Sequence, residues 1–364
     1  MTPSDSPIAT ARDDRAAERL AWARSTLGDP SLTLESASVD ASFRSYWRTV
    51  HEGQSWIVMD SPPDLEDPQP WLDIGARLHH AGLHVPAVRA HDAARGLLLI
   101  EDLGSRLYLP ALRGGNPDAL YGEALDALLR MQSAVPTDGM APYDEAFLRR
   151  ELAIMPEWFL DRHLGCATAA ADQQVLEAAF EVVLHSALEQ PRCFVHRDFH
   201  SRNLLIVDHV APASDAGHPV LAIPAKPMLA SPGIIDFQGA LAGPLTYDLA
   251  SLLRDCYIAW DDARVQGWVE SYRVRLCDAG LLDGVDRATF LRWFDLIGLQ
   301  RHLKVLGIFC RLWYRDGKRG YLGDLPLVYR YVMEVSARYP ELAALRALIE
   351  RAVGDRDLTA PSAA

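Results

Sequence analysis

Short runs in which apolar residues are bounded by polar turn residues dominate the first hundred positions. Such runs have the character of strands, and they occur in five places, at 32–39, 45–50, 56–59, 88–91 and 97–101. Helical spacing predicts a helix before these runs, at 13–27, and one between them, at 70–81, and a glycine follows each helix. We therefore predict a small lobe made of an antiparallel sheet with a leading helix.

The pattern changes after Gly104 to long amphipathic helices. They are predicted at 118–133, 143–163, 168–188, 246–260, 265–279, 287–313 and 325–339. Three brief strand-like runs, 193–195, 204–207 and 233–235, interrupt the helices, and the Pro-, Ala- and Gly-rich segment 208–232 is interpreted as a surface insertion. The predicted class is α+β, with an N-terminal lobe at 1–103, a mainly helical C-terminal lobe at 104–355 and a frayed tail at 356–364.

The composition limits the kinds of molecule that the protein is expected to bind. With 364 residues, 49% of them hydrophobic, the chain can bury one or two sizeable cores. The net charge of -13 disfavours nucleic-acid binding, which needs clustered positive charge. No apolar run is long enough to span a membrane, and the polar N-terminus does not resemble a signal peptide, so we expect a cytoplasmic protein. The five cysteines show no zinc-site spacing and are expected to be reduced.

The segment FVHRDFHSRNLLI places Asp198 and Asn203 five residues apart between two apolar strands. This arrangement resembles the catalytic loop of kinases. Phosphoryl transfer needs a carboxylate that orients and deprotonates the attacking hydroxyl, and oxygen ligands for Mg²⁺. Asp198 suits the first role and Asn203 the second. Asp236, at the end of the apolar run GII, is the candidate for a further metal ligand.

Asp248, in GPLTYDLA, lies beside a predicted helix start, where its carboxylate could accept backbone N–H bonds. We expect it to support the catalytic loop together with His196. A single Asp in such a place is usually a cap or turn residue. The occurrence of Asp198, Asp236 and Asp248 in this order along the chain favours a kinase.

These motifs carry a family resemblance. HRDFHSRN, IIDFQ and GPLTYDLASLLRD resemble the aminoglycoside-phosphotransferase superfamily, and most closely its anomeric N-acetylmuramate/N-acetylglucosamine kinases. Two further stretches, ELAIMPEWFLDRHL and QRHLKVLGIFCRLWYRDGKRGYL, support the narrower group. The resemblance implies a bilobal protein-kinase-like fold, with ATP and Mg²⁺ as cofactors. It also implies phosphorylation of the C1 hydroxyl of an amino sugar in peptidoglycan recycling, upstream of a nucleotidyltransferase with which no complex is required.

The small lobe departs from the kinase pattern in two ways. The turn Ser42-Phe-Arg-Ser45 has no glycine, although its backbone with Ser42, Arg44 and Ser45 could bind phosphate. The chain has only three lysines, and none precedes Lys226. Either an arginine such as Arg44 supplies the positive charge of the missing lysine, or Mg²⁺ and backbone N–H donors provide more of the phosphate binding. The alternative for this turn is an ordinary hairpin tip.

The run LLLIEDLG at 97–104 resembles a kinase hinge, where backbone groups pair with adenine and aliphatic side chains cover its faces. Met59, Glu101 and Leu103 are therefore assigned to the nucleotide site. A plain linker is the alternative.

A basic stripe is predicted on the helix 287–313 and just beyond it, formed by Arg301, Lys304, Arg311 and Arg315. Arg301, Lys304 and Arg311 could pair with the lactyl carboxylate of N-acetylmuramate, whereas a solvated face paired with acids is the alternative. The resemblance also places Glu157, Trp158 and Gln238 near the acceptor.

Two other functions stay open at this stage. The acidic balance favours a kinase for cationic acceptors such as aminoglycosides or choline-like alcohols. The missing lysine and glycine loop favour a non-catalytic nucleotide-binding protein.

Overall fold

A computed structural model describes residues 7–39, 43–166, 169–207 and 227–362. The predicted insertion at 208–232 therefore lies largely outside the described residues, as does Ser42. The chain forms two compact units, one made of Met1–Arg106 with Leu205–Gln238 and the other of Leu107–Leu204 with Gly239–Ala364. We predicted one division after residue 103, whereas Leu205–Gln238 returns to the first unit. It is held there by bonds such as that from Ile206 N to the carbonyl of Arg106, 2.8 Å.

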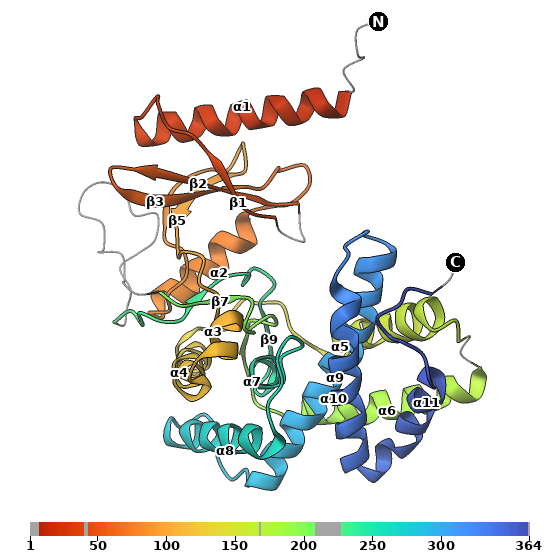
Figure 1. The fold of residues 1–364 in the computed structure, drawn as a ribbon. Helices are drawn as coiled ribbons and strands as arrows, with labels where there is room; N and C mark the ends of the chain where they lie inside the picture. Colours follow the sequence, from red (N-terminus) through yellow and green to blue (C-terminus); the bar gives the residue numbers. More distant parts are fainter. Residues whose placement is uncertain (1–6, 40–42, 167–168, 208–226, 363–364) are drawn as a thin grey trace, which may run out of the picture. The chain divides into compact units, whose positions relative to one another are not determined.

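The first unit is built on a five-stranded antiparallel sheet (Figure 1). Its strands are β1 (Glu35–Val39), β2 (Ser45–His51), β3 (Gln54–Asp60), β4 (Val88–Asp92) and β5 (Leu97–Glu101). The order is β1-β2-β3-β5-β4, so β1 to β3 form an antiparallel meander and β5 lies between β3 and β4. The five predicted strands and their antiparallel pairing are confirmed.

Helix α1 (Pro7–Leu27) packs on the sheet, and α2 (Gln69–His80) follows β3 in the chain (Figure 1). Trp22 and Leu27 of α1 join Trp56, Val58 and the sheet's other inward residues in one buried cluster. Burial of these side chains supplies the main driving force for docking the helix.

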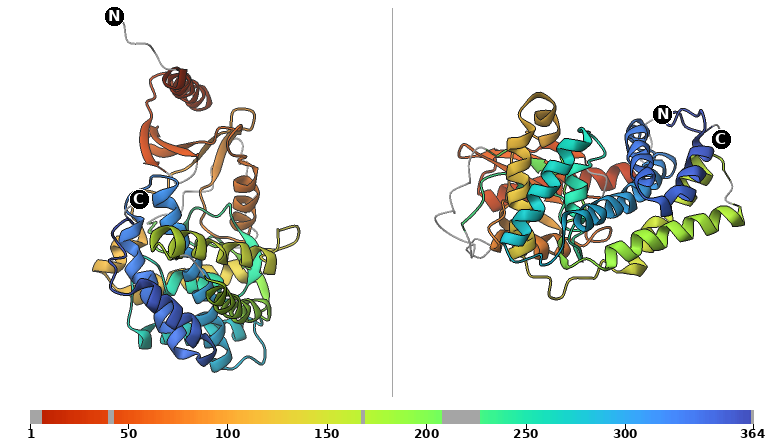
Figure 2. Two further views of the ribbon diagram at one scale, coloured as in Figure 1. Left: turned by 90° about the vertical axis from the view of Figure 1, so that its right-hand side faces the viewer. Right: turned by 90° about the horizontal axis from the view of Figure 1, so that it is seen from below.

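The second unit is mainly helical (Figures 1 and 2). Its α-helices are α3 (Tyr108–Gly114), α4 (Pro117–Ala134), α5 (Glu145–Leu152), α6 (Ala170–Leu188), α7 (Tyr247–Leu253), α8 (Asp262–Asp278), α9 (Arg287–Tyr314), α10 (Leu325–Arg338) and α11 (Ala343–Val353). A π-helix, η1 (Pro156–His163), and the short 3₁₀ turns η2 (Tyr321–Asp324) and η3 (Pro340–Leu342) complete the set. α11 and α6 lie side by side.

Helix α9 is the centre of this unit. It packs against α5, α6, α7, α8, α10 and η1, and every residue from Trp293 to Leu303 is buried. A helix that is buried on all sides can hold polar side chains only where neighbouring groups form hydrogen bonds or ion pairs with them. The polar residues of α9 are therefore candidates for interior roles.

Two predicted helices are shorter than expected. The helix predicted at 143–163 stops at Leu152 and continues as the π-helix η1, which Pro156 begins. Gly307 of α9 explains the close approach there, because a Cβ on it would stand 2.4 Å from the carbonyl oxygen of Ile154. The helix predicted at 246–260 ends at Leu253, and Asp255 just beyond it accepts the N–H of Ser201. Helices α3 and α11 were not predicted.

The chain end is anchored where we expected a frayed tail. Leu358 is buried, and its carbonyl lies 3.1 Å from Nε2 of His163 in η1. Residues 356–362 thus pack on the second unit.

None of the described helices is long and apolar enough to cross a membrane.

Candidate active site

The segment His196–Asn203 connects β6 (Arg192–Val195) to β7 (Leu204–Leu205). β6 pairs with β9 (Leu241–Pro244), a strand that we did not predict, and β7 pairs with β8 (Gly233–Ile234). Both ends of the segment are therefore fixed in short sheets, and we call it the catalytic loop.

Asp248 holds the backbone of the catalytic loop. Its carboxylate is fully buried and accepts the N–H of His196 at 2.6 Å and that of Arg197 at 2.9 Å. Both bonds come from N–H groups of the loop, so Asp248 supports the catalytic loop in the way that the sequence led us to expect. Burial raises the pKa of Asp248 to about 7, against the effect of these two bonds.

Asp198 and Asn203 lie together within the loop. The side-chain amide nitrogen of Asn203 donates to the carbonyl of Asp198 at 3.0 Å, and His200 N donates to the same carbonyl at 3.0 Å. Asp198 N in turn donates to Nδ1 of His196 at 3.3 Å. Because the amide nitrogen of Asn203 is turned inward, its oxygen faces away from this carbonyl.

Positive charge surrounds the carboxylate of Asp198. Burial alone would raise its pKa, but Lys304, His200, Arg301 and Arg197 outweigh burial and hold the pKa below its ordinary value. Asp198 is therefore ionised at neutral pH. It is a weak base that is kept in its charged form.

Glu151 binds two of these cations. One oxygen lies 2.7 Å from Nζ of Lys304 and 2.5 Å from a guanidinium nitrogen of Arg197, and the other accepts the hydroxyl of Tyr143. Glu151 is 5% exposed. Arg197 adopts a left-handed backbone with φ of 78°, a strained conformation that is often found at functional sites. We had predicted no role for Glu151, Arg197 or Tyr143 from the sequence.

Arg301 has a different environment. It is 4% exposed, and one guanidinium nitrogen lies 3.1 Å from the sulfur of Cys256. In the described part of the chain it forms no ion pair with a carboxylate. A buried guanidinium whose partner is a thiol can still receive an anion.

The basic stripe is thus divided. Lys304 pairs with Glu151 in the interior, while Arg315 is exposed and pairs with Asp316. Burial, followed by repulsion from Arg315, lowers the pKa of Arg311, against the attraction of Glu157. Glu157 itself is exposed on η1, and neighbouring Trp158 is half-buried. A wholly solvated stripe, the alternative we weighed, is wrong for Arg301 and Lys304.

Asp236 follows β8 in the first unit with a left-handed φ of 64°. Its carboxylate accepts the side-chain amide of Gln238 at 2.8 Å and faces a guanidinium nitrogen of Arg44 at 3.7 Å. Arg44 is buried and also pairs with Glu66 at 3.3 Å. The arginine that we expected near phosphate is thus held between two carboxylates, of which Glu66 was not predicted.

The side chains assigned to the nucleotide face the interior of the first unit. Met59 has no exposed surface, and Leu103 is 7% exposed. The carboxylate of Glu101 lies 3.1 Å from Nε2 of His84 and accepts Ala87 N at 3.2 Å. The hydroxyl of Ser45 accepts the indole N–H of Trp47 at 2.9 Å. The nucleotide-binding roles of these side chains stay predictions. Because the side chains are engaged in the interior, we expect the backbone groups of the hinge to contact the adenine base.

The donors suit a magnesium ion that arrives with its nucleotide. Among the described residues, no three His, Cys, Asp or Glu side chains cluster as a preformed metal site. Asn203 and Asp236 offer amide and carboxylate oxygens, and Mg²⁺ is usually held by one or two such groups together with phosphate oxygens. The chemistry of this pair therefore fits the predicted ion.

Comparisons with known proteins agree with this geometry. Residues 33–212 match the model of a phosphotransferase enzyme family. The chain is 41% identical over 321 residues to the N-acetylmuramate/N-acetylglucosamine kinase of Pseudomonas putida, and the aligned region covers 88% of each chain. It is 36% identical over 342 residues to the kinase of the same name from Neisseria meningitidis, 93% of this chain and 96% of that one.

Two solved structures show the fold. An ADP-bound aminoglycoside phosphotransferase, APH(2'')-Ib, has a TM-score of 0.54 at 13% identity and covers 87% of this chain and 96% of its own. Choline kinase LicA from Streptococcus pneumoniae has a TM-score of 0.57 at 13% identity and covers 89% and 99%. The predicted kinase-like fold is confirmed.

Proposed function

The chain belongs to the family of N-acetylmuramate/N-acetylglucosamine kinases, and we propose that it transfers the terminal phosphoryl group of ATP to the C1 hydroxyl of these two sugars. The family membership confirms the resemblance carried by HRDFHSRN and IIDFQ. One observation supports the chemistry above all others. Asp198 is an ionised carboxylate on a fixed loop, surrounded by Lys304, Arg197 and Arg301.

Asp198 orients the sugar and takes its proton. The C1 oxygen attacks the terminal phosphorus and forms the new O–P bond, while the bond to the bridging oxygen breaks and ADP leaves with that electron pair. The hydroxyl proton passes to the carboxylate of Asp198. A hemiacetal hydroxyl is more acidic than an ordinary alcohol, so a weak base of lowered pKa suffices.

The cations near Asp198 stabilise the negative charge of the transferring group. Lys304 and Arg197 are held by Glu151, which prevents them from closing directly onto Asp198. Fixed charges in a buried setting stabilise a developing charge without reorganising. This would compensate for the absence of a lysine before Lys226.

Asn203 and Asp236 would hold the Mg²⁺ that accompanies ATP, and the ion would neutralise phosphate charge. Arg44 is the phosphate-binding cation of the first unit in this proposal, and Glu66 is the residue that positions it. Replacing Arg44 with Met should raise the KM for ATP more than Arg44→Lys does, and Glu66→Gln should have an intermediate effect. Equal KM values for all three variants would refute this role.

Arg301 is our candidate for the lactyl carboxylate of N-acetylmuramate, because it is a buried guanidinium without a carboxylate partner among the described residues. Arg301→Ala should lower kcat/KM for N-acetylmuramate more than for N-acetylglucosamine, since the latter lacks the carboxylate. Arg315→Ala, on the exposed end of the same stripe, is the matched control. Equal losses on both sugars would reject the contact.

A substrate panel tests the function itself. With ATP and Mg²⁺, N-acetylmuramate and N-acetylglucosamine should be phosphorylated, whereas aminoglycosides, choline and the methyl glycosides blocked at C1 should not. Phosphorus–proton NMR of the product should place the phosphate on C1. If a methyl glycoside were phosphorylated as readily as the free sugar, the assignment of C1 as the phosphorylated position would be refuted. We further propose that the resulting sugar 1-phosphate feeds a nucleotidyltransferase in peptidoglycan recycling.

A further inference from the structure

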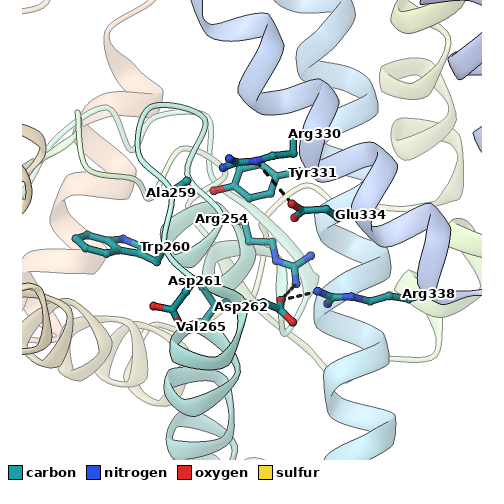
Figure 3. A pocket seen from close by; sticks show the side chains of 10 residues that line it. All are labelled: Arg254, Ala259, Trp260, Asp261, Asp262, Val265, Arg330, Tyr331, Glu334 and Arg338. Atoms are coloured by element: carbon teal, nitrogen blue, oxygen red, sulfur yellow. Dashed lines mark hydrogen bonds and ion pairs between the residues drawn. The ribbon is translucent and has the colours of Figure 1, made fainter.

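A pocket of about 380 Å³ lies in the second unit between the residues that follow α7, the start of α8 and α10 (Figure 3). Arg254 stands between Trp260 on one side and Arg330, Glu334 and Arg338 on the other (Figure 3). The volume falls in the range of small-molecule sites. No role in the phosphotransfer proposed above has been given to any of these residues.

The pocket is separate from the cluster around Asp198. Its residues Arg254 and Tyr331 contact α9 through His302, whose Nε2 lies 2.9 Å from the carbonyl of Arg254 and whose ring stacks on Tyr331. Successive residues of a helix point about 100° apart, so His302 lies roughly 100° from Arg301 and about 160° from Lys304. The two groups of side chains therefore occupy different faces of α9.

The pocket contains a polar atom that lacks a partner. Arg254 is 2% exposed, and its Nη2 lies 2.9 Å from Asp295 and 3.4 Å from Asp262. Its Nη1 is buried without a hydrogen bond in the described structure. An unpaired buried donor costs about 1–3 kcal/mol, which a bound acceptor oxygen would recover.

The charges around this donor favour a neutral ligand. Three arginines and three acidic residues line the pocket, so their formal charges cancel. Asp262 binds Arg338 at 2.5 Å, and Glu334 faces Arg330 at 3.7 Å. A full anion would meet these carboxylates, whereas hydroxyl groups can accept from arginine and donate to carboxylates alike.

Two aromatic residues line the pocket. Trp260 and Tyr331 contribute aromatic rings, and both already use their polar atoms elsewhere. The indole N–H of Trp260 donates to the hydroxyl of Tyr121 at 2.9 Å, and the hydroxyl of Tyr331 donates to the carbonyl of Ile258 at 3.3 Å. Because the ring of Tyr331 is stacked on His302, the half-buried ring of Trp260 is the aromatic surface that we assign to an apolar sugar face.

We infer that this pocket binds a neutral, polyhydroxylated molecule of monosaccharide size, with one ligand oxygen accepting from Nη1 of Arg254. The inference does not rest on the proposed function. The occupant would be a second sugar besides any acceptor bound near Asp198.

Fluorine NMR of the full chain labelled with 5-fluorotryptophan tests the site directly. The chain has nine tryptophans, and the variant Trp260→Phe identifies the signal of Trp260. Titration with N-acetylglucosamine or with glucose should shift this signal saturably, and inorganic phosphate should leave it unchanged. A signal that ignores both sugars, or that responds only to phosphate, would overturn the inference.

Two variants separate binding in the pocket from an effect transmitted from elsewhere. Ala259→Leu fills the pocket, and Ala263→Leu adds the same bulk at an exposed position nearby. Ala259→Leu should weaken the response by at least about tenfold in affinity, or 1.4 kcal/mol, and Ala263→Leu should retain it. Equal responses in the two variants would reject the site. Because no phosphoryl transfer is measured, a failure here leaves the proposed kinase function standing, and the reverse also holds.

Discussion

Replacing Glu151 with Gln should strongly destabilise the second unit. The substitution keeps the shape of the side chain but removes the charge that compensates Lys304 and Arg197. Burial alone would raise the pKa of Glu151, but Lys304 and Arg197 hold it below its ordinary value, so the carboxylate is ionised at neutral pH. An amide cannot balance the two cations that it would face.

The expected magnitude follows from burial. Glu151 is 5% exposed, and the side chains of Lys304 and Arg197 are 14% and 19% exposed. Removing one partner from a buried ion pair costs about 3–5 kcal/mol. For a unit of this size that corresponds to a fall in melting temperature of about 10 °C. Raising the ionic strength should recover little of the loss, since buried pairs are weakly screened.

Thermal and urea unfolding of purified variants measure the effect. Glu181→Gln is the matched control, because Glu181 pairs with Arg149 while 63% exposed and should lose less than about 1 kcal/mol. Adding Lys304→Met to Glu151→Gln removes one uncompensated cation and should restore part of the stability. A Glu151→Gln variant as stable as the control, or a double variant that shows the sum of both single losses, would refute the reasoning.

Further outcomes can be measured on the same protein. Asp198→Asn should lower kcat by roughly 10²–10⁴-fold, and undiminished turnover would remove Asp198 from the mechanism. Because the pKa of Asp248 is raised to about 7, the folded protein retains a proton that the unfolded chain releases above about pH 4. Its contribution to the free energy of unfolding should therefore fall by up to about 1.4 kcal/mol per unit as pH rises to 7, and Asp248→Asn should lack this slope in urea titrations. Gly307→Ala should cost about 1–3 kcal/mol through its contact with Ile154, whereas Gly298→Ala, with its nearest atom 3.7 Å away, should not destabilise; equal stabilities would contradict the close approach.

Local patterns were enough to predict the sheet and the catalytic loop. Each strand of the first unit is a short local run with strand character, and the loop motif places Asp198 and Asn203 within one short segment. The hydrogen bond from the amide of Asn203 to Asp198 is therefore a contact between near neighbours in the chain. Such contacts follow from spacing, because little of the rest of the fold is needed to make them.

The environment of the loop could not be predicted in the same way. Tyr143 and Glu151 are near neighbours in the chain, but Arg197 and Lys304 come from two distant parts of it, and no local spacing relates them to Glu151. The break before η1 depends on Gly307 in a distant helix. One signal was present, since Glu151 lies in a helix whose neighbours Leu148 and Leu152 are apolar and buried. A carboxylate on an apolar helix face requires a buried cation as partner.

The distribution of positive charge gives the two units different tasks. Arg44 in the first unit lies between the carboxylates of Glu66 and Asp236, which give its guanidinium a fixed position. Around Asp198 in the second unit, Lys304 and Arg197 share the single carboxylate of Glu151, and Arg301 donates to the sulfur of Cys256. Lys304, Arg197 and Arg301 thus lie near the carboxylates of Glu151 and Asp198, and Asp255 also attracts Arg301. In the proposed mechanism, these fixed cations would stabilise the negative charge that develops in the transition state.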